Sequence, residues 1–170
     1  MVNSEQCGNF MSRIVVGVSD IRVSGDVEDI LITYALGSCI GIAVYDPVVK
    51  VGGLLHFMLP DSSIDLNKAV KTPAMFADTG IPLLFKSCYR LGAEKRHMIV
   101  KVAGGSNVMD NANYFRIGQK NIIALRKIFW RNNVLIDGED IGGYYNRTVL
   151  LDISTGKVVV KDSGRILREL

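Results

Sequence analysis

Two runs of residues with strand-like patterns lie on either side of a short turn sequence. Within residues 39–45, Ile40, Ile42 and Val44 alternate with smaller or more polar residues, and residues 51–58 form a second, largely apolar run. Period-two alternation of this kind predicts β-strands. The Asp46-Pro47 pair between the two runs predicts a turn. We therefore expect a β-hairpin over residues 39–58.

The register of this hairpin decides which side chains meet across it. A four-residue loop over residues 46–49 would pair Tyr45 with Lys50 and place Cys39 opposite His56. Their Cβ atoms would then lie about 5 Å apart on one face. A one-residue slip would turn His56 to the other face, and the adjacent glycines at 52–53 could host a bulge. A thiol beside an imidazole supplies a nucleophile and its base.

The remaining patterns predict further strands and two helices. Candidate strands cover residues 14–19, 30–35, 97–103, 134–136, 148–153 and 157–161, with a hairpin turn at residues 154–156. The first twelve and last eight residues have no clear pattern and are expected to be chain ends without regular secondary structure.

One predicted helix has an apolar stripe of Ala77, Ile81, Leu84, Cys88 and Leu91, a glycine cap at Gly92, and Pro82, which should start, kink or break it. A second covers residues 117–132 and turns Ile122, Leu125, Ile128 and Phe129 inward. Paired strands with two principal helices predict an α+β fold of mainly antiparallel or mixed sheets.

Composition narrows the classes of function. The chain has 170 residues, 48% of them hydrophobic, which predicts a single domain over residues 1–170 with an ordered core at about 13–161. A net charge of +3 from scattered basic residues argues against nucleic-acid binding. No apolar run approaches the roughly 20 residues of a membrane span. Three cysteines without a C-x-x-C pair predict a reduced, cytoplasmic protein.

Each candidate residue also has a purely structural interpretation. Cys88 lies on an apolar helical stripe, which favours a buried core thiol, and Cys7 lies in the N-terminal tail. Cys39 is flanked by glycines at 37 and 41, which would admit a substrate but would equally serve a turn. His56 could be a base or a hydrogen-bonded core residue, whereas His97 is expected to be exposed or half-exposed. The small number of potential ligands makes a metal site improbable, and no cofactor is expected.

Two polar, glycine-rich stretches are interpreted as turns. Residues 103–107, Ala-Gly-Gly-Ser-Asn, lack the lysine and spacing of a phosphate-binding loop and are expected to form a turn after a strand. Asp137, Glu139 and Asp140 lie among glycines and are expected to be solvated carboxylates, with acid or base catalysis as a remote alternative.

Several motifs together resemble the CheD family of chemoreceptor glutamine deamidases. They are L-G-S-C-I-G at 36–41, H-F-M-L-P at 56–60, G-G-S-N at 104–107, I-G-Q-K-N at 117–121 and D-I-G-G at 140–143. The resemblance extends from about residue 14 to residue 161. The sequence departs from the family pattern at residues 144–147 and 119–120, which affects expected substrate or partner contacts more than chemistry.

The resemblance implies a cysteine hydrolase with a catalytic triad of Cys39, His56 and Thr33. It also implies a fold similar to the catalytic domain of cytotoxic necrotizing factors. The expected substrates are glutamines on the cytoplasmic helices of methyl-accepting chemotaxis receptors, and a CheC-type phosphatase is a possible partner. Two alternatives remain: a regulatory module that binds such a phosphatase with little deamidation, and another cysteine amidase or a transglutaminase.

Overall fold

The computed structural model describes residues 11–107 and 116–170. Within these residues it has two five-stranded sheets and three α-helices, which confirms the α+β class. Sheet one has the order β1 (Ser12–Val15), β3 (Asp29–Leu36), β8 (Arg147–Asp152), β9 (Val158–Asp162) and β10 (Arg165–Glu169). Sheet two has the order β2 (Asp20–Ser24), β5 (Val51–Phe57), β4 (Ile40–Asp46), β6 (Ile99–Gly104) and β7 (Gly138–Ile141).

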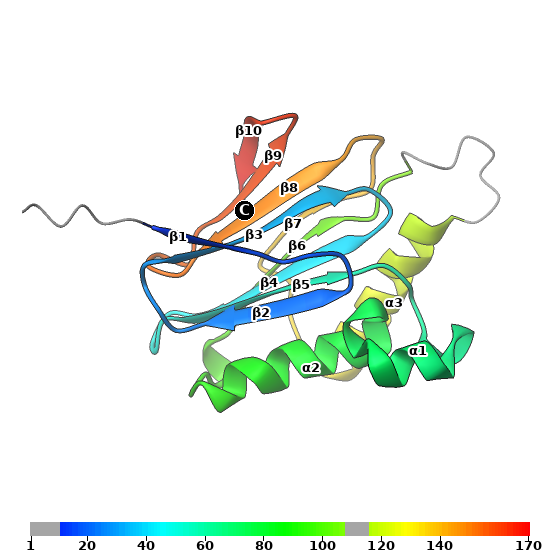
Figure 1. Ribbon diagram of the computed structural model, residues 1–170, viewed down its shortest axis with the longest axis horizontal. Coiled ribbons are helices and arrows are strands. Elements are labelled where there is room, and N and C mark those ends of the chain that lie inside the picture. The colour runs from blue at the N-terminus through cyan, green and yellow to red at the C-terminus, as the bar shows by residue number, and fades with distance from the viewer. Residues whose placement is uncertain (1–10, 108–115) are drawn as a thin grey trace, which may run out of the picture.

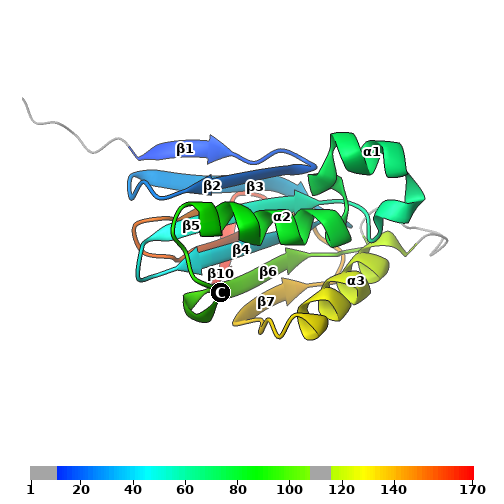
Figure 2. The same ribbon diagram turned by 90° about the horizontal axis from the view of Figure 1, so that it is seen from below.

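Three layers result from this arrangement, with the helices on the outer face of sheet two (Figures 1 and 2). The helices are α1 (Leu66–Lys71), α2 (Ala77–Arg90) and α3 (Ile117–Arg131), and short 3-10 turns lie at Ser62–Ile64, Pro73–Met75 and Lys95–His97. Most strand pairs are antiparallel, but β1 pairs with β3 and β6 with β7 in parallel. The sheets are therefore mixed.

Sheet two is apolar on both faces because it lies between the other two layers. Ile42, Val44 and Leu55 pack toward α2 and α3, together with Leu84 and Phe129 of those helices. The opposite face contributes to the core between the sheets, which consists mainly of Leu31, Leu36, Ala43, Tyr45, Leu54, Val149, Leu151, Val158 and Val160. Every residue of β4 and β5 is buried, which explains their dense apolar sequence.

Glycines at 52 and 53 let β5 approach both neighbouring layers. A side chain at Gly52 would come within 2.6 Å of Ile153, and one at Gly53 within 2.8 Å of Cys88 and Leu84. The β4–β5 ladder is continuous past both positions, so the possible bulge is absent. The glycines serve close packing.

The two long helices follow the predicted patterns closely. Helix α2 runs through Pro82 without ending, and Gly92 adopts a positive φ of 95° just after it. Cys88 is fully buried as predicted, whereas Leu91 is 47% exposed, so its assignment to the buried stripe was wrong. Helix α3 ends one residue before the predicted boundary and buries Leu125 and Phe129.

The strand predictions fail at residues 134–136 and at the two ends of the chain. Residues 134–136 are loop, and the strand of that region is β7, a few residues later. The last eight residues include β10, which pairs with β9, so the prediction that they lack regular structure was wrong. At the N-terminus β1 already begins at Ser12, while Cys7 lies outside the described residues. The predicted turn at residues 154–156 joins β8 to β9.

Candidate active site

His56 reaches across the core from one sheet to the other. It lies on β5, is 1% exposed, and is on the strand face that also carries Leu54 of the inter-sheet core. Its Nδ1 lies 2.8 Å from Oγ1 of Thr33, which belongs to β3 of sheet one and is fully buried. The structure therefore brings two of the three predicted triad residues into direct contact.

The hydrogen bonds around Thr33 determine which ring nitrogen of His56 carries the proton. Thr33 Oγ1 donates its hydrogen to the carbonyl of Val16 at 2.7 Å, so it must accept from His56 Nδ1–H. The neutral ring then has a lone pair on Nε2. Among the described residues, this buried Nε2 has no hydrogen-bond partner. The Thr33 contact is thus made by the hydroxyl and leaves Nε2 available as a base.

Cys39 lies just before β4, and its register with His56 differs from the prediction. The hairpin pairs Asp46 with Val51 and Gly41 with His56, so the loop covers residues 47–50. The predicted direct pairing of Cys39 with His56 is wrong by two residues. A two-residue shift preserves the face, and Cys39 becomes a diagonal neighbour on the same side, where long side chains are within reach of each other.

A short irregular segment carries the chain from Thr33 to Cys39. The β3–β8 ladder shifts register after Thr33, Ala35 adopts a positive φ of 56°, and Gly37 N–H donates to the Ala35 carbonyl at 2.9 Å. Positive φ in a residue other than glycine is strained and common near functional sites. The bulge lies just before the end of β3, where Leu36 makes the last pair with Arg147, and the chain then crosses to sheet two.

The glycine-rich loop after β6 holds the Cys39 segment in place. Gly105 N–H donates to the Cys39 carbonyl and Ser106 N–H to the Gly37 carbonyl, each at 2.8 Å. Gly104 has a φ of 115°, and a side chain there would overlap the Cys39 carbonyl oxygen. The loop is a turn leaving a strand, as predicted, and it supports the backbone on both sides of the thiol.

The glycines beside Cys39 face other parts of the protein. A side chain at Gly41 would come within 2.8 Å of Leu36, and one at Gly37 would lie 3.0 Å from the Asn146 amide oxygen. These glycines allow close packing around the thiol, so the interpretation that they admit a substrate is not needed to explain them.

Burial keeps both reactive groups in their neutral forms. Desolvation raises the pKa of the half-buried Cys39 thiol, although its own backbone N–H, directed at the sulfur, partly opposes this. Desolvation also lowers the pKa of His56 to about 4. Cys88 is fully buried, with its pKa raised to about 12, and is unreactive by comparison.

The carboxylates at residues 137–140 have structural roles. Asp140 is 6% exposed and lies 3.0 Å from the buried Arg147, so its prediction as a solvated turn residue was wrong. Asp137 accepts a hydrogen bond from Val100 N–H at 2.7 Å, and Glu139 pairs at the surface with Arg126 at 2.9 Å. None of these bonds involves Cys39 or His56.

Sequence reasoning did not place two buried polar residues near the site. Ser106 and Asn121 are both fully buried, and each lies in a quoted motif. Asn121 precedes Leu125 and Phe129 by one and two helical turns, so it shares their inward face. A lone amide on an apolar stripe was the available signal.

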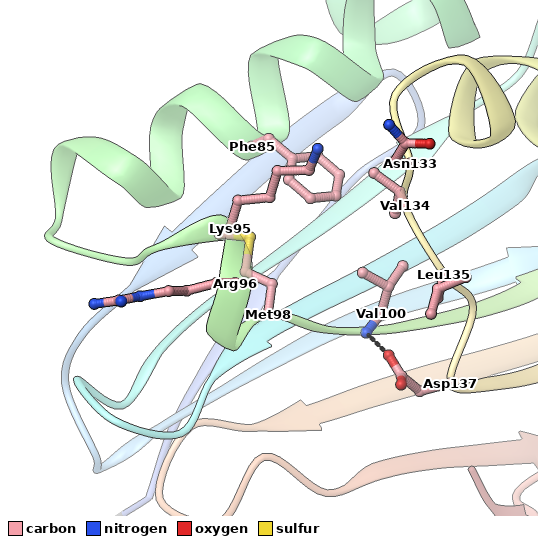
Figure 3. A pocket seen from close by; sticks show the side chains of 9 residues that line it. All are labelled: Phe85, Lys95, Arg96, Met98, Val100, Asn133, Val134, Leu135 and Asp137. Carbon is pink, nitrogen blue, oxygen red and sulfur yellow. Dashed lines mark hydrogen bonds between the residues drawn. The ribbon is translucent and has the colours of Figure 1, made fainter.

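A hollow of about 440 Å³ lies at the other end of β6 from Gly104 (Figure 3). Its lining residues are Phe85, Lys95, Arg96, Met98, Val100, Asn133, Val134, Leu135 and Asp137. Because β6 begins here and ends beside Cys39, this hollow is separate from the candidate active site. His97, next to this region, is half-exposed as predicted.

The described residues show neither a metal-ligand cluster nor a membrane-spanning helix. In residues 11–107 and 116–170, no group of three potential side-chain ligands could hold a metal ion. Across the same ranges, the helices are too short or too polar to cross a membrane.

Comparison with known proteins identifies the family. Residues 58–162 match the family model described as CheD chemotactic sensory transduction. The chain is 68% identical to "Probable chemoreceptor glutamine deamidase CheD 1" of Syntrophus aciditrophicus, over 94% of this chain and all of that protein. This chain belongs to the CheD family.

Other CheD relatives are more distant but match over similar lengths. "Probable chemoreceptor glutamine deamidase CheD" of Solibacter usitatus is 48% identical, covering 91% of this chain and 92% of that protein. A protein of the same name from Pyrococcus horikoshii is 38% identical over 94% of this chain and 99% of its own length. The stretch that matches the CheD family model begins at residue 58, after Thr33, Cys39 and His56.

Proposed function

We propose that this CheD protein is a chemoreceptor glutamine deamidase in which Cys39 is the nucleophile, His56 the general base and Thr33 the group that orients His56. The observation that carries the proposal is the hydrogen bond from His56 Nδ1–H to Thr33 Oγ1. It fixes the tautomer that leaves Nε2 unprotonated, on the strand face shared with Cys39. The names of the relatives supply the substrate class.

The first chemical step transfers the thiol proton during attack. Because burial raises the pKa of Cys39 and lowers that of His56, the resting pair is neutral. The sulfur attacks the side-chain carbonyl carbon of a glutamine while Nε2 accepts the thiol proton. We assign the backbone N–H of Cys39, whose hydrogen bond to the sulfur lowers the thiol pKa, as a donor to the developing oxyanion.

The remaining steps release ammonia and restore the enzyme. The tetrahedral intermediate collapses as the carbon–nitrogen bond breaks, and His56 returns the proton to the leaving ammonia. Water then attacks the thioester, with His56 accepting a proton from it. The carbon–sulfur bond breaks as His56 returns that proton to the sulfur, which gives glutamate and the free thiol. The net reaction converts glutamine and water to glutamate and ammonia.

The product differs from the substrate by one negative charge. On neighbouring receptor helices, like-charged carboxylates repel each other, which gives deamidation a physical route to altered signalling. Substrate glutamines on cytoplasmic helices would place the protein in the cytoplasm. A CheC-type phosphatase is a proposed partner on the strength of the family resemblance.

Mass spectrometry of a purified receptor cytoplasmic fragment tests the reaction directly. Wild type should convert specific glutamines to glutamate, and Cys39→Ala and His56→Ala should each abolish most of this activity. Cys88→Ala is the matched control and should retain turnover, since that thiol is buried in the core on the helix side of sheet two, whereas Cys39 packs against the core between the sheets. A primary amine in the mixture should not become incorporated, because incorporation would indicate a transglutaminase. Normal turnover by Cys39→Ala would overturn the assignment.

Thiol labelling tests the nucleophile without a substrate. A substoichiometric alkylating agent near neutral pH should label Cys39 before Cys88, with peptide analysis reporting Cys7 separately. The variant His56→Ala should slow labelling of Cys39 by removing its base. Preferential labelling of Cys88 in the folded protein would contradict the proposed roles.

A further inference from the structure

Helix α3 carries a buried amide directed at the two chain segments that bear the reactive groups. Asn121 is fully buried, and its Nδ2 donates to the carbonyl of Ser38 at 2.9 Å and to that of Met58 at 3.0 Å. Both partners are acceptors only, so the NH₂ group must face them and its two hydrogens are both used. The orientation of the amide is thereby fixed.

The two carbonyls flank the proposed nucleophile and base. Ser38 directly precedes Cys39, and Met58 lies two residues after His56. The β4–β5 ladder ends with the pairing of Ile40 and Phe57, so both carbonyls lie just beyond the last paired residues. One amide therefore continues the connection between the two segments where the ladder stops.

Asn121 is itself held firmly in position. A side chain at Gly118, one turn earlier in α3, would come within 2.6 Å of the Gly105 carbonyl, so the helix packs tightly on the loop that supports Cys39. One turn later, Leu125 is 1% exposed in the core. Asn121 therefore lies on a helix whose turns before and after it both pack closely against the rest of the protein.

We infer that Asn121 is a positioning residue that sets the spacing between Cys39 and His56. Both of its hydrogen bonds go to backbone carbonyls, those of Ser38 and Met58, so it acts on the reacting groups through their neighbouring backbone. The inference rests on the proposed deamidase function. A misplacement of about 1 Å between reacting groups can cost roughly a hundredfold in rate, so loss of this connection should affect the chemical step.

The test compares Asn121→Ala with two controls on the same helix or its end. Asn132→Ala removes an exposed amide that donates only to the Ile128 carbonyl, at 2.8 Å. Phe129→Ala lowers stability from the same helix two turns after Asn121, where its ring packs against Phe85 of α2. Each variant is assayed for kcat, KM, the rate of Cys39 alkylation and stability in urea, under conditions where it is folded.

Asn121→Ala should lower kcat about ten- to a hundredfold with little change in KM, and should slow Cys39 alkylation. Asn121→Ser keeps one hydroxyl donor and should fall between wild type and Asn121→Ala, and it serves if the alanine variant does not fold. Asn132→Ala should match wild type, and Phe129→Ala should lose stability but keep kcat.

Two results would overturn the inference: wild-type kcat and alkylation in Asn121→Ala, or an equal loss of kcat in Phe129→Ala. A failure of the proposed function can be told apart from a failure of this inference, because in the first case wild type would leave the receptor fragment unchanged. Cys39 alkylation would in that case decide the inference, with slower labelling in Asn121→Ala supporting it and unchanged labelling opposing it.

Discussion

Thr33 contributes one hydroxyl that both accepts from His56 and donates to the Val16 carbonyl. Thr33→Val keeps the shape of the side chain but leaves the buried His56 Nδ1–H without a hydrogen-bond partner. This should lower the free energy of unfolding by about 1–3 kcal/mol. We expect deamidation and Cys39 alkylation to fall about ten- to a hundredfold.

Thr33→Ser is the matched control, because it restores the hydroxyl and should recover most of the rate. The comparison requires kcat and thiol labelling on the same preparations. Equal activity of the valine and serine variants would mean that the hydroxyl does not orient the ring.

His56 should make the folded protein less stable in mild acid. Its pKa falls from 6.5 to about 4 on folding because of desolvation, so the unfolded chain binds a proton that the folded protein excludes between these values. Stability is therefore lost as pH falls below about 6.5, by up to roughly 3 kcal/mol, and the loss levels off near pH 4.

Urea unfolding of wild type and His56→Asn across this pH range isolates the effect. The asparagine variant cannot titrate, so the difference between the two free energies of unfolding should change with pH. A constant difference would show that His56 has an ordinary pKa. The acid limb of activity should likewise lie near pH 4 in the free enzyme, since Nε2 stays unprotonated above it.

The site was partly predictable at the level of residues. Cys39 and His56 were indicated by an alternating pattern that puts both on one strand face, and that face is preserved. Thr33 gave no signal of its own, since a threonine in a strand is ordinary and its contact to His56 crosses between sheets. Long-range contacts of this kind depend on how sheets stack, which local patterns do not specify.

The β4–β5 turn shows why the predicted register was wrong at the level of elements. Lys50 was expected to begin the second strand, but it adopts a positive φ of 52° and belongs to the loop. Lysine rarely takes this conformation, so the sequence carried no sign of it. A glycine at the same position would have marked the turn.

Lys50→Gly should therefore stabilise the protein by about 1 kcal/mol, because it relieves an unfavourable φ at an exposed position. Val48→Gly in the same loop is the control. Its φ is not positive, so glycine there should destabilise by about 0.5–1 kcal/mol through the entropy of the unfolded chain. Thermal melting measures both, and a destabilised Lys50→Gly would contradict the argument.

Across the whole molecule, buried polar contacts join the two sheets at separate places. Asp140 on β7 of sheet two pairs with Arg147 on β8 of sheet one, and Tyr145 adds a hydrogen bond at 2.9 Å. Burial raises the pKa of Asp140, but Arg147 and the Tyr145 hydroxyl outweigh this and lower it overall. This pairing was missed because glycine-rich sequence around Asp140 suggested a surface turn.

Asp140→Ala should lower the free energy of unfolding by about 3–5 kcal/mol, because it leaves Arg147 buried without its carboxylate partner. Glu139→Ala, one residue earlier, breaks an exposed pair with Arg126 and should cost less than about 1 kcal/mol. Urea unfolding of the two variants provides the comparison. Similar losses in both would mean that burial does not distinguish the two pairs.

The class of fold and the two long helices followed from periodicity, whereas the assembly of the sheets did not. The parallel pairing of β1 with β3 and the addition of β10 at an edge involve strands with weak patterns of their own. Every residue of β10 is exposed, so alternation could not reveal it. Backbone pairing with β9, which leaves little trace in side-chain character, defines it.

In the proposed mechanism, the contact between His56 and Thr33 makes turnover depend on the spacing between the two sheets. The two residues belong to different sheets, so the 2.8 Å distance between His56 Nδ1 and Thr33 Oγ1 depends on how closely the sheets approach each other. Substituting a smaller residue for Leu54 or Leu151, which lie between the sheets, would change that distance without altering a reacting atom. Kinetics of this enzyme would then report on mechanical changes in its core that a substrate never meets.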